Sequence, residues 1–99
     1  MRYTFEWDPI KAKENLRKHK VSFERAAEVF RDSMALSIFD EEHSEREERW
    51  VTIGKDSHES VLVLIHTFSK LAVEECTIRI ISARKANRTE TRQYEEIKS

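Results

Sequence analysis

The sequence predicts a small α+β domain in which an antiparallel β-sheet packs against helices, in the order β-α-α-β-β-β-β-α. Three observations on the 99 residues lead to this prediction. Apolar residues recur at helical spacing in the first third of the chain, and from residue 35 onward they alternate with polar residues, as in strands. The connections between these strands are short, which favours antiparallel neighbours. The length fits one domain over residues 1–99, because it leaves no room for a second core.

The N-terminal third is expected to form one strand and two helices. Residues 2–7 alternate and place three aromatic side chains on one face, which predicts a short strand. The pair Asp8-Pro9 then opens a helix, with Asp as N-cap and Pro in the first turn, where no N–H is needed. This helix should run to about Lys18 or His19. Ser22 is the expected cap of a second helix, in which Phe and Ala recur at core spacing.

Four further strands and a last helix are expected after Asp32. The alternating segments that predict the strands are residues 35–39, 49–54, 60–68 and 76–83. Residues 55–59 and 69–72 should form the hairpin loops. Asn87 and Glu90 have the spacing of a capping box, which predicts a final helix reaching Glu96.

Charge is spread unevenly along the chain. The net charge is only −1, yet basic residues dominate residues 9–20 and 79–92, and acidic residues dominate residues 40–48. Because the distribution matters more than the sum, the surface should still bind a charged partner.

The sequence indicates a cytoplasmic protein. Its apolar runs fall far short of the ~20 residues that cross a bilayer, and the first residues lack the hydrophobic core of a signal peptide. The lone Cys76 cannot form an internal disulfide, which suits a reducing compartment, and we expect it to be a small buried residue.

Three segments in order carry a resemblance to a known family. The first contains Phe5-Glu6-Trp7-Asp8, Asn15, Lys18-His19 and Val21-Ser22-Phe23; the second runs from His43 to Arg49 and on to Ile53-Gly54; the third is residues 79–84 with Tyr94-Glu95. Over nearly its whole length the sequence resembles the BrnT toxins. The resemblance implies a RelE-like fold, ribonuclease activity that halts translation, and a co-transcribed antitoxin.

One position departs from the family pattern. After Lys18-His19 the family usually has Gly, the residue that ends helices in a left-handed conformation. This sequence has Lys20 instead. A non-Gly residue in that conformation costs roughly 1 kcal/mol, so either Lys20 is strained or the helix ends differently.

Two arginines are candidates for binding the phosphate that a ribonuclease attacks. Arg79 interrupts an apolar strand, where a charge must reach the sheet surface or be paired, so it is either a phosphate ligand or half of a structural ion pair. Arg84 ends the same strand and is either a phosphate ligand or a solvated terminus. Arg suits this task because its planar fork donates two parallel hydrogen bonds.

Residues 43–49 offer an imidazole, carboxylates and guanidinium groups together. If they line the site, His43 or Glu47 is the expected base and Arg49 a phosphate ligand; an ordinary solvated loop would have the same composition. His19 is a further acid or base, because an imidazole exchanges its proton near neutral pH. The sequence does not separate acid from base among His19, His43 and Glu47.

A further set of residues is expected to contact the RNA backbone. Lys11, Asn15 and Lys18 have the spacing of one helix face, and Arg88 belongs to the second basic segment. The alternative for the helix is a hydrated face. Three aromatic residues could stack bases, although core packing is the expected role: Trp7, Trp50 and Phe68.

No metal or other cofactor is expected, so the ribonuclease should be metal-independent. His43 and His58 do not have metal-ligand spacing with each other or with Cys76. Proton transfer by side chains then supplies the chemistry.

The expected partners are RNA and an antitoxin. The resemblance implies a BrnA-like ribbon-helix-helix antitoxin dimer that holds two toxins in a heterotetramer and alone contacts promoter DNA. The residues are also compatible with two other hypotheses: a non-enzymatic RNA- or ribosome-binding growth inhibitor of the same fold, and a module that binds only protein. A steep salt dependence of binding would argue against the second.

Overall fold

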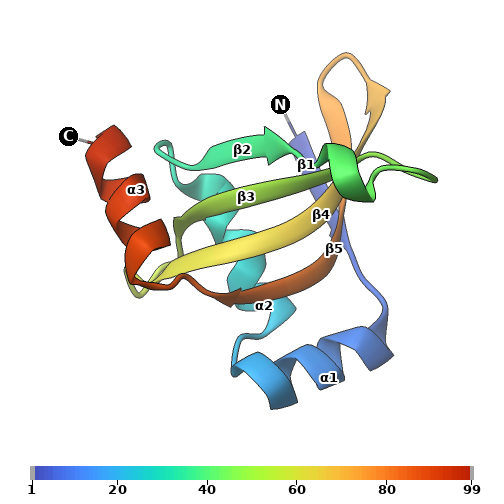
Figure 1. Ribbon diagram of the computed structural model, residues 1–99. Helices are drawn as coiled ribbons and strands as arrows, with labels where there is room; N and C mark the ends of the chain where they lie inside the picture. Colours follow the sequence, from blue (N-terminus) through green and yellow to red (C-terminus); the bar gives the residue numbers. More distant parts are fainter. Residues whose placement is uncertain (1, 99) are drawn as a thin grey trace.

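The computed structural model describes residues 2–98 and has a five-stranded sheet in the order β1-β5-β4-β3-β2, with three α-helices (Figure 1). The elements are β1 (Arg2–Glu6), α1 (Pro9–His19), α2 (Phe23–Ala27), the 3-10 turn η1 (Glu28–Arg31), β2 (Leu36–Phe39), the 3-10 turn η2 (Glu41–His43), β3 (Arg49–Lys55), β4 (Val61–Ala72), β5 (Glu75–Lys85) and α3 (Arg88–Lys98). The predicted α+β class is confirmed. None of the described helices combines the length and apolar character needed to span a membrane.

The sheet is mixed. The four strands β2 to β5 are antiparallel neighbours as predicted, but the expectation of an antiparallel sheet is wrong for β1. Strand β1 pairs in parallel with β5, with Tyr3 opposite Cys76, while the other neighbours are antiparallel. The predicted loop at residues 69–72 is also wrong, because it continues β4. The hairpin instead turns at Val73 and Glu74, which lets Ala72 pair with Glu75.

The core lies between one face of the sheet and the helices α1 and α2. In Figure 1, α2 lies behind the sheet and α1 lies below it. Phe23 and Ala26 of α2 belong to the same buried cluster as Leu64 and Ile80 of the sheet. Cys76 is buried in this cluster, as expected. Two of the aromatic residues named above pack against it while remaining partly exposed: Trp7 and Phe68.

The predicted helix starts are confirmed by their hydrogen bonds. The Asp8 carboxylate accepts from the Ile10 N–H at 2.8 Å, and the Ser22 hydroxyl accepts from the Arg25 N–H at 3.1 Å. Before α3, Asn87 and Glu90 each accept from the other's backbone N–H, at 2.8 and 2.9 Å. This reciprocal pair is a capping box.

Lys20 ends α1 in the left-handed conformation, with φ 60° and ψ 25° and its N–H donated to the Leu16 carbonyl at 3.0 Å. We therefore expect Lys20→Gly to raise the free energy of unfolding by up to about 1 kcal/mol, because Gly adopts this conformation without strain. Urea denaturation measures the change. Arg17→Gly, within the same helix, is the control and should lower stability by about 1 kcal/mol; a lower midpoint for Lys20→Gly would contradict the expectation.

Candidate functional site

Three polar side chains form a row across the face of the sheet that points away from the core. The register places Arg49 of β3 opposite Thr67 of β4, and Thr67 opposite Arg79 of β5. Cross-strand partners share a face, and Thr67 lies between the inward-facing His66 and Phe68. Two guanidinium groups and a hydroxyl therefore lie on one surface.

A carboxylate joins this row from the loop before β3. Glu47 forms an ion pair with Arg79, and the two side chains are 39% and 41% exposed. This arrangement agrees with both interpretations of Arg79, because the charge is paired and also lies at the surface. We call Glu47, Arg49, Thr67 and Arg79 the Arg79 cluster.

The loop between β2 and β3 is closed at its base by hydrogen bonds. The Asp40 N–H donates to the Arg49 carbonyl at 2.8 Å, and the Ser44 hydroxyl accepts from the Arg49 N–H at 3.0 Å while donating to the Asp40 carbonyl. His43 Nδ1 lies 2.9 Å from the Asp40 carboxylate. The loop thus holds His43 near the start of β3.

A hollow of about 510 Å³ opens inside this loop. It is lined by Glu42, His43, Glu45, Arg46, Glu47 and Arg49. Arg49 Nε is buried and has no hydrogen-bond partner among the described residues. A buried donor of this kind requires an acceptor, and a phosphate oxygen is a strong one for a guanidinium.

Helix α1 lies at the opposite end of the molecule from the loop between β2 and β3, whose residues line this hollow (Figure 1). Lys11, Lys18 and His19 are exposed on it. The structure therefore brings His43, Glu47, Arg49 and Arg79 together and leaves His19 apart from them.

The expectation that Asn15 shares the exposed face of α1 is wrong. Asn15 is only 5% exposed. The amide nitrogen donates to the carbonyls of Val21 and Ala83, at 2.9 and 2.8 Å, and the amide oxygen accepts from the Ala83 N–H at 3.1 Å. Asn15 thus ties α1 to β5.

Arg84 and Arg88 lie at the junction of β5 and α3, away from the Arg79 cluster. The guanidinium of Arg84 donates to both carboxylate oxygens of Glu90, at 2.7 and 2.8 Å. These hydrogen bonds raise the pKa of Arg84 and lower that of Glu90 to about 2. Arg84 is therefore not a solvated strand end, because its guanidinium is hydrogen-bonded to the carboxylate of Glu90 in the same chain. Arg88, the first residue of α3, is exposed.

Two residues near the cluster carried no signal in the sequence. Thr67 joins the row only through strand register. His66 is fully buried, with Nε2 2.6 Å from the Thr52 hydroxyl, and its ring lies edge-on to Phe30 and Phe68. Burial lowers the pKa of His66 to about 4, so it is a neutral core residue near pH 7.

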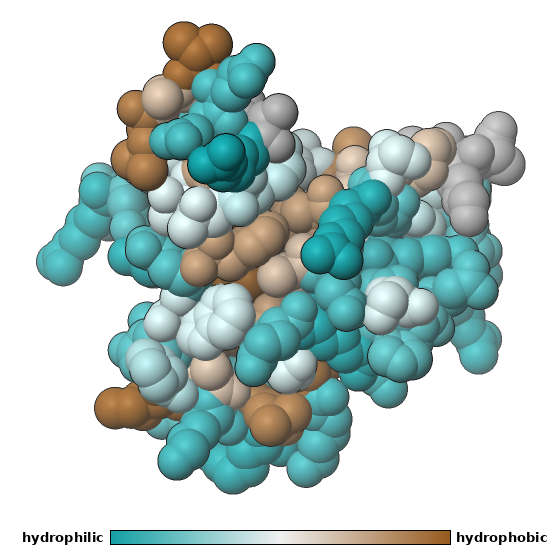
Figure 2. Space-filling view, turned by 180° about the vertical axis from the view of Figure 1, so that it is seen from behind, coloured by the Kyte–Doolittle hydropathy of each residue, from teal (hydrophilic) through white to brown (hydrophobic). Residues whose placement is uncertain are grey.

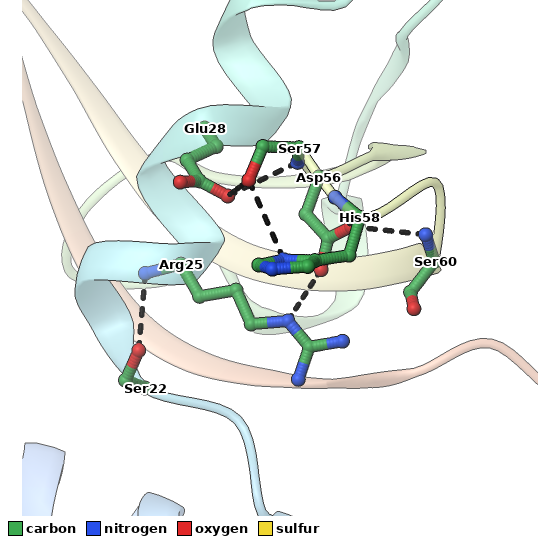
Figure 3. Close-up of polar contacts among 7 residues, drawn as sticks. All are labelled: Ser22, Arg25, Glu28, Asp56, Ser57, His58 and Ser60. Carbon is green, nitrogen blue, oxygen red and sulfur yellow. Dashed lines mark hydrogen bonds and ion pairs between the residues drawn. The ribbon is translucent and has the colours of Figure 1, made fainter.

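A second polar cluster fixes the β3–β4 loop to α2 (Figure 3). Asp56 is buried, pairs with Arg25 Nε, and accepts from the N–H groups of His58 and Ser60 at 2.8 and 2.9 Å. Glu28 accepts from Ser57. The ligand atoms of Glu28, Asp56 and His58 lie within 4.8 Å of one another, and both carboxylates already accept hydrogen bonds from protein groups. This cluster acts as a structural clamp.

Comparisons with known proteins concern the family and the fold of this chain. The sequence model of the family described as "Ribonuclease toxin, BrnT, of type II toxin-antitoxin system" matches residues 7–90. The 1.1 Å crystal structure of the Brucella abortus ribonuclease toxin BrnT superimposes with a TM-score of 0.58 at 20% identity, covering 89% of this chain and 100% of that one. At this identity the likeness concerns the fold. No curated protein matches the chain.

Proposed function

The chain belongs to the BrnT family of ribonuclease toxins of type II toxin–antitoxin systems. We propose that it cleaves RNA in the cytoplasm without a metal ion and that this cleavage inhibits translation. The observation that carries the proposal is the Arg79 cluster with its paired carboxylate. It combines the cations and the base that cleavage beside a 2′-hydroxyl requires.

The phosphate of the substrate binds Arg49 and Arg79, which releases Glu47 from its ion pair. Glu47 takes the proton of the 2′-hydroxyl, whose oxygen attacks phosphorus while the bond to the 5′-oxygen breaks. His43, held at Nδ1 by Asp40, gives a proton to that leaving oxygen. The products are a 2′,3′-cyclic phosphate and a 5′-hydroxyl.

The remaining sequence candidates take outlying roles in this proposal. Lys11, Lys18 and Arg88 are exposed cations away from the cluster and serve as contacts to the RNA backbone. His19 and Arg84 have no role in the chemistry. His19 lies on α1, apart from the Arg79 cluster, and the guanidinium of Arg84 is hydrogen-bonded to Glu90.

Purified toxin free of partner should therefore cut RNA in the presence of EDTA. Replacing the 2′-hydroxyl at the cut by hydrogen should block the reaction there, because the attacking oxygen is gone. Mapping the product ends and positions by sequencing gels measures both. Cleavage that requires magnesium and survives the 2′-deoxy change would overturn the mechanism. Tight RNA binding with no new ends would favour the non-enzymatic inhibitor instead.

The antitoxin is proposed to be a BrnA-like ribbon-helix-helix dimer. Family membership supports a partner that neutralises the toxin, and the paired Arg79 suggests that a partner carboxylate can replace Glu47 there. Two toxins bound to one antitoxin dimer would form a heterotetramer. That complex would bind promoter DNA through the antitoxin, because this sequence has no DNA-reading motif of its own.

Co-expression with the adjacent antitoxin gene should restore growth, and the purified complex should have the mass of four chains by light scattering. The complex should bind its promoter, whereas the toxin alone should not. Sequence-specific promoter binding by the isolated toxin would contradict this division of roles.

A further inference from the structure

A second hollow lies at the start of β3, on the helix side of the sheet. Its volume is about 420 Å³, within the range of small-ligand sites. It is lined by Tyr3, Glu48, Trp50, Phe68, Lys70 and Cys76. Figure 2 shows this side of the molecule, where hydrophobic side chains form a band between hydrophilic ones and other hydrophobic side chains gather at the top and bottom.

The aromatic walls of this hollow are held in place by other rings. Trp50 lies edge-on to Phe68, with ring centroids 5.9 Å apart and planes at 88°. Phe39 packs against Trp50 at 5.3 Å. Both Trp50 and Phe68 stay partly exposed, so they do not merely fill the core.

Two buried side-chain donors without partners belong to consecutive residues at the start of β3, and only the second of these residues lines this hollow. Among the described residues, the buried side-chain nitrogen and oxygen atoms that lack a hydrogen bond are Arg49 Nε and Trp50 Nε1. Neither group can accept a hydrogen bond. A ligand that satisfies both must therefore present acceptors on both sides of the start of β3, because consecutive strand residues face opposite ways.

RNA presents such acceptors in adjacent parts of one nucleotide. We propose that this hollow binds a nucleobase next to the phosphate held by Arg49, and so sets the base preference of cleavage. The base stacks on the rings of Trp50 and Phe68 and accepts from Trp50 Nε1, while Glu48 and Lys70 contact its polar edge. This inference rests on the proposed ribonuclease function and extends it to substrate choice.

The two tryptophans of the chain, Trp7 and Trp50, allow a direct test. In Trp7→Phe, Trp50 is the sole indole, and its fluorescence should be quenched as a 2′-deoxy-blocked RNA oligonucleotide binds, in step with binding measured by anisotropy. In Trp50→Phe, the emission of Trp7, which packs on Phe23 at 5.9 Å, should stay constant during the same titration.

The cleavage assay gives a second readout. With oligonucleotides varied at each position beside the cut, Trp50→Phe should reduce the discrimination between bases at one position about fivefold to tenfold, the value of one hydrogen bond. Trp7→Phe should keep the wild-type preference. RNA binding and cleavage with unchanged Trp50 emission and unchanged preference would overturn the base pocket alone. A protein that neither binds nor cuts RNA would overturn the proposed function as well. Quenching by an antitoxin peptide but not by RNA would assign the hollow to the partner.

Discussion

Replacing Arg79 by alanine should lower the rate of RNA cleavage by about 10²–10³-fold and relieve growth arrest. The guanidinium is the cation of the Arg79 cluster that pairs with the proposed base, Glu47. Removing it therefore removes both phosphate binding and the group that positions the base, and a single electrostatic stabiliser of a transition state contributes about this much.

The fold should survive the change. Arg79 is 41% exposed and Glu47 is 39% exposed, and ion pairs of this kind contribute at most about 1 kcal/mol to stability. Thermal melts beside the cleavage assay separate the two roles. A melting temperature several degrees lower would support a structural ion pair, and a folded Arg79→Ala protein with wild-type activity would remove Arg79 from the site.

Two matched variants make this test sharper. Arg79→Lys keeps the charge but loses the planar fork, so most of the activity should still be lost. Glu47→Gln removes the proposed base while leaving Arg79 in place, and it should be inactive although RNA still binds. An active Glu47→Gln would move the role of base to His43.

The local features of the fold could be predicted because their signals are local. Asp8, Ser22 and the Asn87–Glu90 pair cap helices within a few residues of themselves. The parallel pairing of β1 with β5 could not be predicted in this way. It joins residues more than 70 positions apart, such as Tyr3 and Cys76, and the alternating pattern of a strand does not name its neighbour.

The candidate site was predictable in its residue types and not in its arrangement. Glu47 and Arg79 stand out as a carboxylate in a charged loop and a charge in an apolar strand, but their contact spans 32 positions. Thr67 enters the site only because strand register places it between two arginines. Arg84 has the same residue type as Arg79, and only the fold shows that its guanidinium is hydrogen-bonded to the carboxylate of Glu90.

Asn15 shows the limit of helical spacing as a guide. Its position relative to Lys11 and Lys18 predicts a shared exposed face. Its hydrogen-bond partners are instead backbone carbonyls of Val21, just after the end of α1, and of Ala83 in β5. A short polar side chain can form hydrogen bonds to buried backbone groups as readily as to water on an exposed face. The pattern of the helix alone does not distinguish these roles.

Asn15→Asp should therefore destabilise the protein by about 3 kcal/mol or more, a large share of the stability of a small domain. The carboxylate can still accept from the Ala83 N–H but cannot donate to the carbonyls of Val21 and Ala83, so a buried charge faces two acceptors. Asn15→Ala should cost about as much, since it leaves three backbone groups unpaired. Lys18→Ala, on the exposed face of the same helix, is the control and should stay within about 0.5 kcal/mol. Urea denaturation monitored by circular dichroism measures all three. If Asn15 were instead an RNA contact, Asn15→Asp would keep the wild-type midpoint and lose only RNA affinity, and that result would return Asn15 to the binding surface.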